Sequence, residues 1–383
     1  MTDAEQRISM EHLNLNYVVA SAVLLLCFPY GSSAEKALAL FVFGDSYVDT
    51  GNHDPYKASV NEGWRRPYGF DWPGFPAGRY SSGKIQTDRW AEILGFPTPI
   101  AYEKLKTHHC GEMAKKMVNG VNFAVGGSGI FQDYGYITIA QQVQHFKRLI
   151  NETRAFGKRD LGRSIVLLSN AGNDYFAYLD DSNDNVTGLV SLVTPIVTGI
   201  VDVVKELYEH GFRNFVVSDV GALGCFPEIG RTSCDSAYDE VIEFHSRLLK
   251  ESVHQLRSDL KGSNIIIPHL QYAYRHIFSN PTHYGFEDLF CPCCAAKGKV
   301  TGCAEVSDRG EPLFEMCEDP KKRLFWDNRH PTHKGWHALM SLYTYGDIYR
   351  GKKLSFVKGA NNLKDWVKSI GFDAHDISPI SSR

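Results

Sequence analysis

The sequence predicts an α/β protein in which a parallel β-sheet lies between two layers of helices. Five short runs are mainly apolar, with consecutive apolar residues rather than alternation, which is typical of strands buried on both faces. These runs cover 38–43, 121–125, 164–169, 214–220 and 264–268. Helical patterns lie between most of the runs, and this alternation of strand and helix favours a parallel sheet with helical crossovers.

Five segments have the pattern of helices. They cover 87–95, 138–152, 189–211, 235–262 and a segment that follows Pro331. The segment 189–211 is long and apolar, but Pro195, Gly199 and Asp202 interrupt it. We therefore expect a core helix there, and no integral membrane span in the mature chain.

The composition is that of a globular protein with a large core. The chain has 383 residues, of which 43% are hydrophobic and 22% charged, and its net charge is -3. Because no basic stripe is present, nucleic acid is not an expected partner. No internal repeat or Gly/Ser-rich linker divides the chain, so we expect one domain over 35–383.

The N-terminal segment 1–34 has the pattern of a signal peptide. An uncharged apolar stretch covers 17–31 and is short for a membrane span. The small residues Ser32 and Ala34 follow, which predicts cleavage after Ala34. The acidic residues before the apolar stretch are atypical of a signal peptide, so an uncleaved anchor and a start at Met10 remain alternatives. The expected location is extracellular, in the apoplast or cell wall.

The cysteines agree with an oxidising compartment. The chain has nine, and removal of the signal peptide with Cys27 leaves an even number. The candidates for disulfides are Cys225, Cys234, Cys291, Cys293, Cys294, Cys303 and Cys317. A zinc site is the competing interpretation, but the spacing matches no two-plus-two ligand pattern, so we expect no metal. The sequons at Asn151 and Asn185 are candidates for glycosylation.

A serine at the end of the first predicted strand is the candidate nucleophile. The stretch FVFGDSYVDTGN, residues 41–52, runs from an apolar strand directly into Ser46. Open α/β sheets place their chemistry at the carboxyl ends of the strands, although an ordinary turn would also use these residues. A serine hydroxyl needs a base, a group that orients the base, and donors for the oxyanion that forms.

Other strand ends and one turn supply those groups. Asp327 and His330 stand three residues apart before the last predicted helix, a spacing that lets the carboxylate orient the imidazole. Gly127 follows the run at 121–125, and Asn173 follows the run at 164–169. A glycine N–H and an asparagine amide can both donate to an oxyanion. Each feature alone is typical of a turn, but in one sheet these strand ends share an edge.

In combination these motifs resemble the plant GDSL esterase/lipase family of the SGNH hydrolases. The resemblance covers 38–349 and rests on FGDSYVDTGN, NFAVGGSG, AGNDY and DNRHP, in that order. It implies a three-layer α/β/α sandwich of flavodoxin-like type with a five-stranded parallel sheet. It also implies Ser46, Asp327 and His330 as the catalytic triad, and Ser46, Gly127 and Asn173 as the oxyanion hole.

The resemblance implies cleavage of acyl or lipid esters through an acyl-enzyme, without a cofactor. The partner is then a small-molecule or lipid ester. An acyltransferase that passes the acyl group to an alcohol is the alternative, and a non-catalytic binding or defence protein is a further one. Tyr47 stands where the family has Leu, beside the nucleophile. The aromatic-rich insertion 61–83 resembles a family segment at the substrate cleft, although a packed loop would have the same composition.

Overall fold

The fold is described from a computed structural model. It describes residues 39–53, 61–131, 137–170, 172–182, 185–230, 232–297, 302–346, 348–349, 352–353, 355–356 and 360–380. The segment 1–34, which the sequence assigns to a signal peptide, lies outside these residues, as do residues 35–38.

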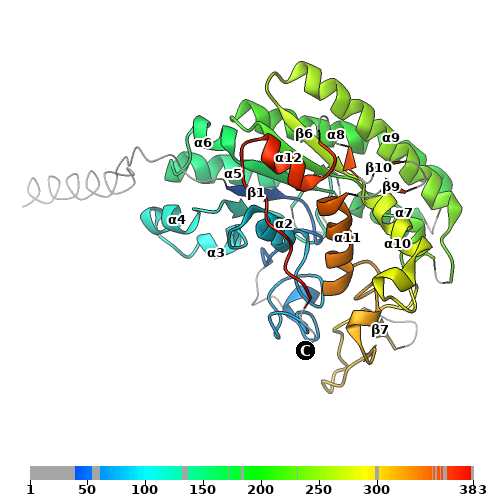
Figure 1. Ribbon diagram of the computed structural model, residues 1–383. Helices are drawn as coiled ribbons and strands as arrows, with labels where there is room; N and C mark the ends of the chain where they lie inside the picture. The colour runs from blue at the N-terminus through cyan, green and yellow to red at the C-terminus, as the bar shows by residue number, and fades with distance from the viewer. Residues whose placement is uncertain are drawn as a thin grey trace, which may run out of the picture.

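A seven-stranded sheet forms the centre of the fold (Figure 1), in the order β11-β6-β5-β4-β1-β3-β2. Its strands are β1 (Leu40–Phe43), β2 (Ile100–Ala101), β3 (Val121–Asn122), β4 (Ile165–Ser169), β5 (Asn214–Ser218), β6 (Asn264–Pro268) and β11 (Ser355–Phe356). Strands β1 to β6 pair in parallel, whereas β11 pairs antiparallel with β6 at the edge.

The α/β/α class is confirmed, but the expected number of five parallel strands is wrong. The structure has six parallel strands, and the one that the sequence did not indicate is β2. This strand has only two residues, Ile100–Ala101, which is too short to form an apolar run that stands out from its neighbours. The antiparallel β11 is equally short and was also not predicted.

Two groups of helices cover the sheet. The longer helices are α2 (Gln86–Leu94), α5 (Ile139–Thr153), α7 (Asn173–Ser182), α8 (Val190–Glu209), α9 (Ser236–Asp259), α10 (Leu270–Ser279) and α11 (His333–Tyr345). Shorter helices are α3 (Tyr102–Leu105), α4 (Cys110–Lys116), α6 (Lys158–Arg163) and α12 (Leu363–Ser369). Helix α8 packs against α5 and α9, whereas α11 packs against α2, α10 and α12. All five helices that the sequence predicted are present.

The chain reverses its direction across the sheet at β1. From β1 it passes through α2 to the edge strand β2 and returns to β3, and from there α5, α8 and α9 lead to β4, β5 and β6 on the other side. In open α/β sheets such a switch point leaves a crevice at the carboxyl ends of the strands. The loops after β1, β3 and β4 meet there.

Strand β1 is fully buried, and all four of its residues have no exposed surface. Phe41 and Phe43 both pack against Phe146 of α5 in edge-to-face contacts. Phe43 also stacks on Phe123, which follows β3. These aromatic contacts fix the strand that leads into Ser46, so the loop after β1 starts from a rigid element.

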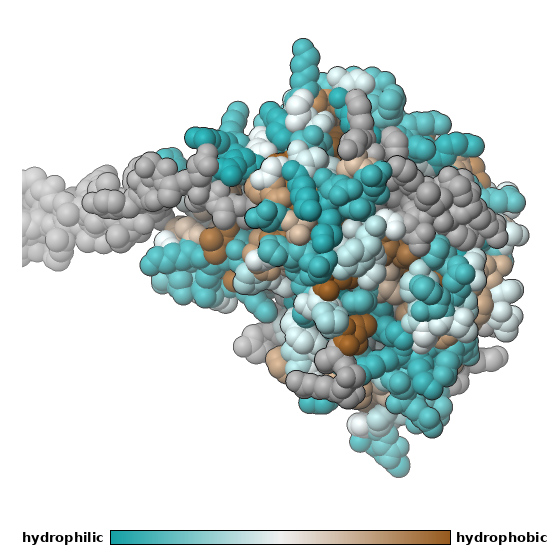
Figure 2. All heavy atoms as spheres, in the orientation of Figure 1, coloured by the Kyte–Doolittle hydropathy of each residue, from teal (hydrophilic) through white to brown (hydrophobic). Residues whose placement is uncertain are grey.

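Helix α8 accounts for the long apolar run. Among the described residues one helical segment, Val186–Glu209, is long and apolar enough to cross a membrane, with a mean hydropathy of 1.8. In the structure one face of this helix, which includes Val193, Ile196 and Ile200, is buried against the core. The face of the molecule in Figure 2 is hydrophilic over most of its area, with apolar residues in small separate groups.

Three disulfides are present, and they use six of the seven candidate cysteines. They join Cys225 to Cys234, Cys293 to Cys317 and Cys294 to Cys303. The seventh candidate, Cys291, forms no disulfide with any described residue. The physical reason is that Cys293 and Cys294 take the two other cysteines of this loop.

The last two disulfides hold the cysteine-bearing segment in place, and β7 (Cys294–Ala296) pairs with β8 (Phe314–Met316) within it. The buried side chains here form a small core of their own, in which Tyr68 and Trp326 pack with Cys293, Cys294 and Cys303. The insertion 61–83 and the turn that carries Asp327 therefore meet on this segment.

Candidate active site

Ser46 lies in the turn directly after β1, where Gly44 lets two strands approach closely. Gly44 has a φ of 145°, and a Cβ atom there would lie 2.2 Å from the carbonyl oxygen of Ser169 in β4. Only glycine fits this position. The side chain of Gln142 holds the peptide by accepting from the Gly44 N–H and donating to the Gly44 carbonyl, at 2.8 and 2.7 Å.

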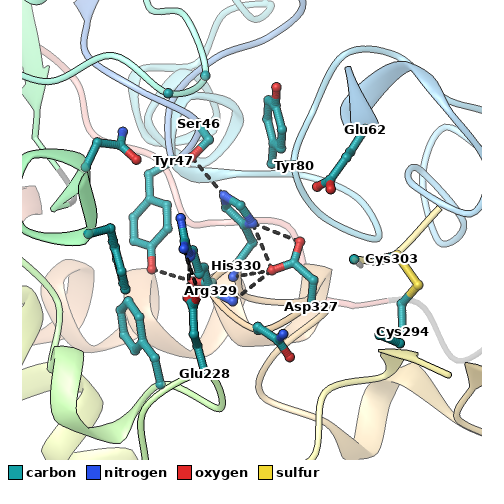
Figure 3. A pocket seen from close by; sticks show the side chains of 18 residues that line it. Ser46, Tyr47, Glu62, Tyr80, Glu228, Cys294, Cys303, Asp327, Arg329 and His330 are labelled. Carbon is teal, nitrogen blue, oxygen red and sulfur yellow. Dashed lines mark hydrogen bonds and ion pairs between the residues drawn. A yellow bond between two sulfur atoms is a disulfide. The ribbon is translucent and has the colours of Figure 1, made fainter. Parts of the chain in front are cut away.

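Ser46, His330 and Asp327 form a continuous hydrogen-bonded chain (Figure 3). The Ser46 Oγ lies 2.8 Å from the His330 Nε2. The His330 Nδ1 lies 2.8 Å from both carboxylate oxygens of Asp327. With Nδ1 protonated toward the carboxylate, Nε2 is left as the acceptor that faces the serine hydroxyl.

The turn between β8 and α11 prearranges the Asp327–His330 pair. The Asp327 Oδ1 accepts from the backbone N–H groups of Arg329 and His330, at 2.9 and 2.8 Å. Thr332 then caps α11 by accepting from the Gly335 N–H. Burial raises the pKa of Asp327, but the facing imidazole and these N–H donors outweigh it, so the pKa lies below its ordinary value. Asp327 is therefore held as a carboxylate.

Gly127 and Asn173 line the same pocket as Ser46. Gly127 has a φ of 85°, a left-handed conformation that glycine adopts without strain. The backbone N–H groups of Ser46 and Gly127 donate to no described residue. Asn173, the first residue of α7, donates one amide hydrogen to the Ser128 carbonyl at 2.8 Å. This bond orients the amide and leaves its second hydrogen for another acceptor.

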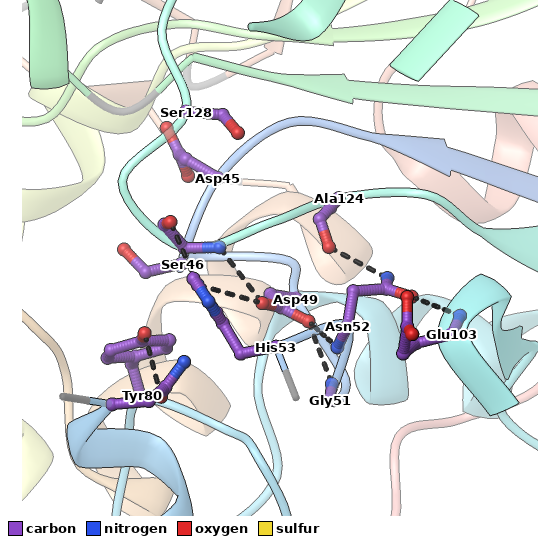
Figure 4. A network of polar contacts seen from close by, with 12 residues as sticks. Asp45, Ser46, Asp49, Gly51, Asn52, His53, Tyr80, Glu103, Ala124 and Ser128 are labelled. Atoms are coloured by element: carbon purple, nitrogen blue, oxygen red, sulfur yellow. Dashed lines mark hydrogen bonds and ion pairs between the residues drawn. The ribbon is translucent and has the colours of Figure 1, made fainter. Parts of the chain in front are cut away.

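Asp49 joins the loop after β1 to the loop after β3 (Figure 4). Its Oδ1 accepts from the N–H groups of Gly51 and Asn52, at 2.7 and 2.8 Å. Its Oδ2 accepts from the Gly126 N–H at 2.9 Å. The carboxylate thereby uses the N–H next to that of Gly127 and fixes the loop that carries Gly127.

The pocket around Ser46 has a volume of about 480 Å³, which is within the usual range for small-molecule sites. Phe176, Phe226 and the ion pair of Arg329 with Glu228 line one part of it. Glu62 and Tyr80 of the insertion and the Cys294–Cys303 disulfide line another part. The insertion 61–83 thus both lines the cleft and packs as an ordinary loop.

Sequence reasoning missed several side chains that touch this site. The Tyr80 ring lies against the imidazole of His330, with centroids 5.2 Å apart. Tyr68 donates to the Asp327 Oδ2 at 2.7 Å, and the Tyr47 hydroxyl donates to the Arg329 carbonyl at 2.7 Å. The insertion marked the region of Tyr68 and Tyr80, and the departure at Tyr47 was noted, but no sequence signal indicated these contacts.

A serine hydroxyl on an imidazole that is itself fixed by a buried carboxylate is the arrangement of a serine hydrolase. The open α/β sheet and the strand-end loops place this protein among the α/β serine hydrolases. The GDSL-like lipase/acylhydrolase family model matches residues 40–342, and the chain belongs to this family. It is therefore a hydrolase of ester bonds.

Curated relatives agree with this assignment. The chain is 31% identical over 312 residues to the GDSL esterase/lipase At5g03610 of Arabidopsis thaliana, with 79% of this chain and 85% of the relative covered. It is 34% identical over 322 residues to At5g03590 of the same species, with 81% and 89% covered. A GDSL lipase of Tanacetum cinerariifolium is 28% identical over 355 residues, with 87% and 91% covered.

Proposed function

We propose that the chain cleaves small carboxylic esters through an acyl-enzyme on Ser46, and that His330 and Asp327 complete the catalytic triad. The observation that carries the proposal is the pair of 2.8 Å contacts that link the Ser46 Oγ to the His330 Nε2 and the His330 Nδ1 to Asp327. This geometry lets the imidazole take the hydroxyl proton while the carboxylate stabilises the imidazolium.

In the first half of the reaction the Ser46 Oγ attacks the ester carbonyl carbon, and its proton moves to the His330 Nε2. The carbonyl oxygen becomes an oxyanion, which the N–H groups of Ser46 and Gly127 and the amide of Asn173 stabilise. The C–O bond to the alcohol then breaks, and the imidazolium returns the proton to the leaving alcohol. The acyl group remains on Ser46 as an ester.

In the second half a water molecule attacks the acyl carbon while His330 Nε2 takes its proton. The tetrahedral intermediate collapses, the proton returns to Ser46 Oγ, and a carboxylic acid leaves. An alcohol in place of water would give a new ester by the same steps, so transfer and hydrolysis share this machinery. Product analysis with a primary alcohol present measures the partition between them.

The Ser46→Ala variant tests the nucleophile. We expect it to lose at least 10³-fold in kcat on a p-nitrophenyl short-chain ester and to lose labelling by a fluorophosphonate probe. Ser169→Ala is the matched control, because Ser169 also ends a strand but its buried Oγ has no partner among the described residues. Full turnover by Ser46→Ala, or labelling of it, would contradict the assignment.

We also propose that the mature chain is secreted as a single domain over 35–383 and is glycosylated. The signal-like segment 1–34 and the three disulfides support secretion, because disulfides persist in oxidising compartments. Asn151 and Asn185 are both exposed, as glycan attachment requires. Expression in a secretory host should give a protein in the medium that begins near Glu35 and loses mass on glycosidase treatment. Retention in the cell would count against secretion.

A further inference from the structure

The hydroxyl of Tyr68 lies between two carboxyl groups behind the proposed triad. Its oxygen is 2.7 Å from the Asp327 Oδ2 and 3.1 Å from the Glu62 Oε2. Tyr68 is only 1% exposed, so water does not reach this ring from bulk solvent. A phenol has one hydrogen to donate, and it can donate it to only one of the two carboxyl groups.

Asp327 is the better acceptor of that hydrogen. The contact with Asp327 is the shorter of the two, and the pKa of Asp327 lies below its ordinary value because His330 and two backbone N–H groups stabilise the charged form against burial. If Tyr68 donates to Asp327, the contact between the oxygens of Tyr68 and Glu62 has no hydrogen unless Glu62 supplies one. Two oxygen acceptors at 3.1 Å without a hydrogen would repel each other.

The surroundings of Glu62 favour the protonated form. Burial raises the pKa of Glu62, and the negative charge of Asp327 raises it further. His330, the Tyr68 hydroxyl and Arg65 act in the opposite direction, and the net pKa is above its ordinary value. The raised pKa favours the protonated form, because the charged form of a carboxyl group loses hydration on burial.

The cysteine-bearing segment contributes to this burial. A Cβ atom on Gly302 would lie 2.8 Å from the Glu62 Oε1, so the backbone at 302 closes on the carboxyl group. The adjacent Cys303 is bonded to Cys294, and all three of these residues line the pocket together with Glu62. No charged side chain of this segment is among the groups that act on Glu62.

We propose that Glu62 is a neutral carboxylic acid that donates a hydrogen bond to Tyr68, and that Tyr68 donates one to Asp327. Two consecutive hydrogen bonds then connect Glu62 to the carboxylate of the proposed triad. Both are positioning residues, since they act through Asp327. The proposal rests on the proposed function of the triad. Its consequence is that Asp327 is held at both oxygens without a second negative charge close to His330.

The absence of a negative charge on Glu62 affects the pH range over which the enzyme is active. A second carboxylate near His330 would favour the imidazolium and raise the pH below which the base is lost. A neutral Glu62 avoids this effect while it still orders Tyr68. A half-buried carboxyl group can therefore stand next to the general base without a cost in activity at mildly acidic pH.

Infrared difference spectroscopy tests the protonation state directly, and it needs no turnover. In the full chain we expect a carboxylic C=O stretch that persists well above the ordinary pKa of glutamate and disappears in Glu62→Gln. Glu228→Gln is the matched control, because Glu228 lines the same pocket but is paired with Arg329, and it should leave this band in place. If Glu62→Gln leaves the band unchanged, or the full chain has none, the proposal is wrong.

The pH profile of kcat/KM provides the second readout, because its acid limb reports the base of the free enzyme. Glu62→Gln should leave the midpoint of the acid limb where it is, since a neutral donor replaces a neutral donor. A shift of that midpoint to lower pH would mean that Glu62 is charged and would overturn the proposal. Tyr68→Phe should lower kcat roughly 10-fold with little change in KM.

These outcomes distinguish a failure of the Glu62–Tyr68–Asp327 proposal from a failure of the proposed triad. Loss of the infrared band in Glu62→Gln does not depend on which serine is the nucleophile, whereas fluorophosphonate labelling of Ser46 does not depend on Glu62. If Tyr68→Phe does not fold, the spectra of the full chain and of Glu62→Gln still decide the proposal.

Discussion

Removal of the Tyr47 hydroxyl should weaken both the fold and the reaction, although this atom touches no reacting group. Tyr47 is 3% exposed and follows Ser46 directly. Its hydroxyl donates to the Arg329 carbonyl at 2.7 Å and lies 3.3 Å from the Tyr274 hydroxyl. Its ring packs edge-on against Trp336 and against His330. The residue therefore ties the loop of the serine to the loop of the histidine.

The Tyr47→Phe variant keeps the ring contacts and removes only the hydrogen bonds. The Arg329 carbonyl loses this donor, and the Tyr274 hydroxyl loses its acceptor. Leaving a buried polar group without its partner costs about 1–3 kcal/mol, so we expect the free energy of unfolding to fall by about 2 kcal/mol. Because Arg329 precedes His330, we also expect a roughly 10-fold lower kcat with an unchanged KM.

Urea denaturation and steady-state kinetics on a p-nitrophenyl ester measure the two effects. Tyr343→Phe is the control, because Tyr343 is buried but its hydroxyl has no partner among the described residues. That variant should be neutral or slightly more stable. Equal stability of Tyr47→Phe and Tyr343→Phe, together with full activity of Tyr47→Phe, would refute the argument that this hydrogen bond holds the histidine loop.

Three further predictions concern the backbone, the pH and the disulfides. Gly44→Ala should lose roughly 3 kcal/mol or more of stability and most of its activity, because its Cβ would lie 2.2 Å from the Ser169 carbonyl oxygen. A variant that is folded by circular dichroism and active in an esterase assay would contradict this. Burial and nearby cations lower the pKa of His333 from 6.5 to about 3, so the unfolded chain binds the extra proton first and stability falls as the pH drops from about 6.5 toward 3. Thermal melts across this range should become less steep in pH for His333→Gln, and identical slopes would count against the assignment. The double variant Cys294→Ser/Cys303→Ser opens a short loop, and its free energy of unfolding should fall by about 3 kcal/mol while its KM rises. Denaturation and kinetics measure the two effects, and an unchanged KM would show that this loop does not shape the pocket.

Local sequence patterns were sufficient to predict five of the seven strands and the residues that follow three of them. The five apolar runs became β1, β3, β4, β5 and β6, and the loops after β1, β3 and β4 bring Ser46, Gly127 and Asn173 to one pocket. This was predictable because buried parallel strands leave continuous apolar runs, and their carboxyl ends necessarily meet at one edge. Strands of two residues, such as β2, carry no such pattern, so the sequence understated the width of the sheet.

By itself, then, the sequence determined the α/β class and the family and led to the proposed triad and oxyanion-hole residues, because each of these depends on short motifs in a fixed order. Only the tertiary structure decided which side chains contact and position these residues from other loops. Tyr68 is 259 positions from Asp327, and Tyr47 is 282 positions from Arg329. Contacts between loops so far apart in the chain depend on how whole layers pack, and no local periodicity encodes them.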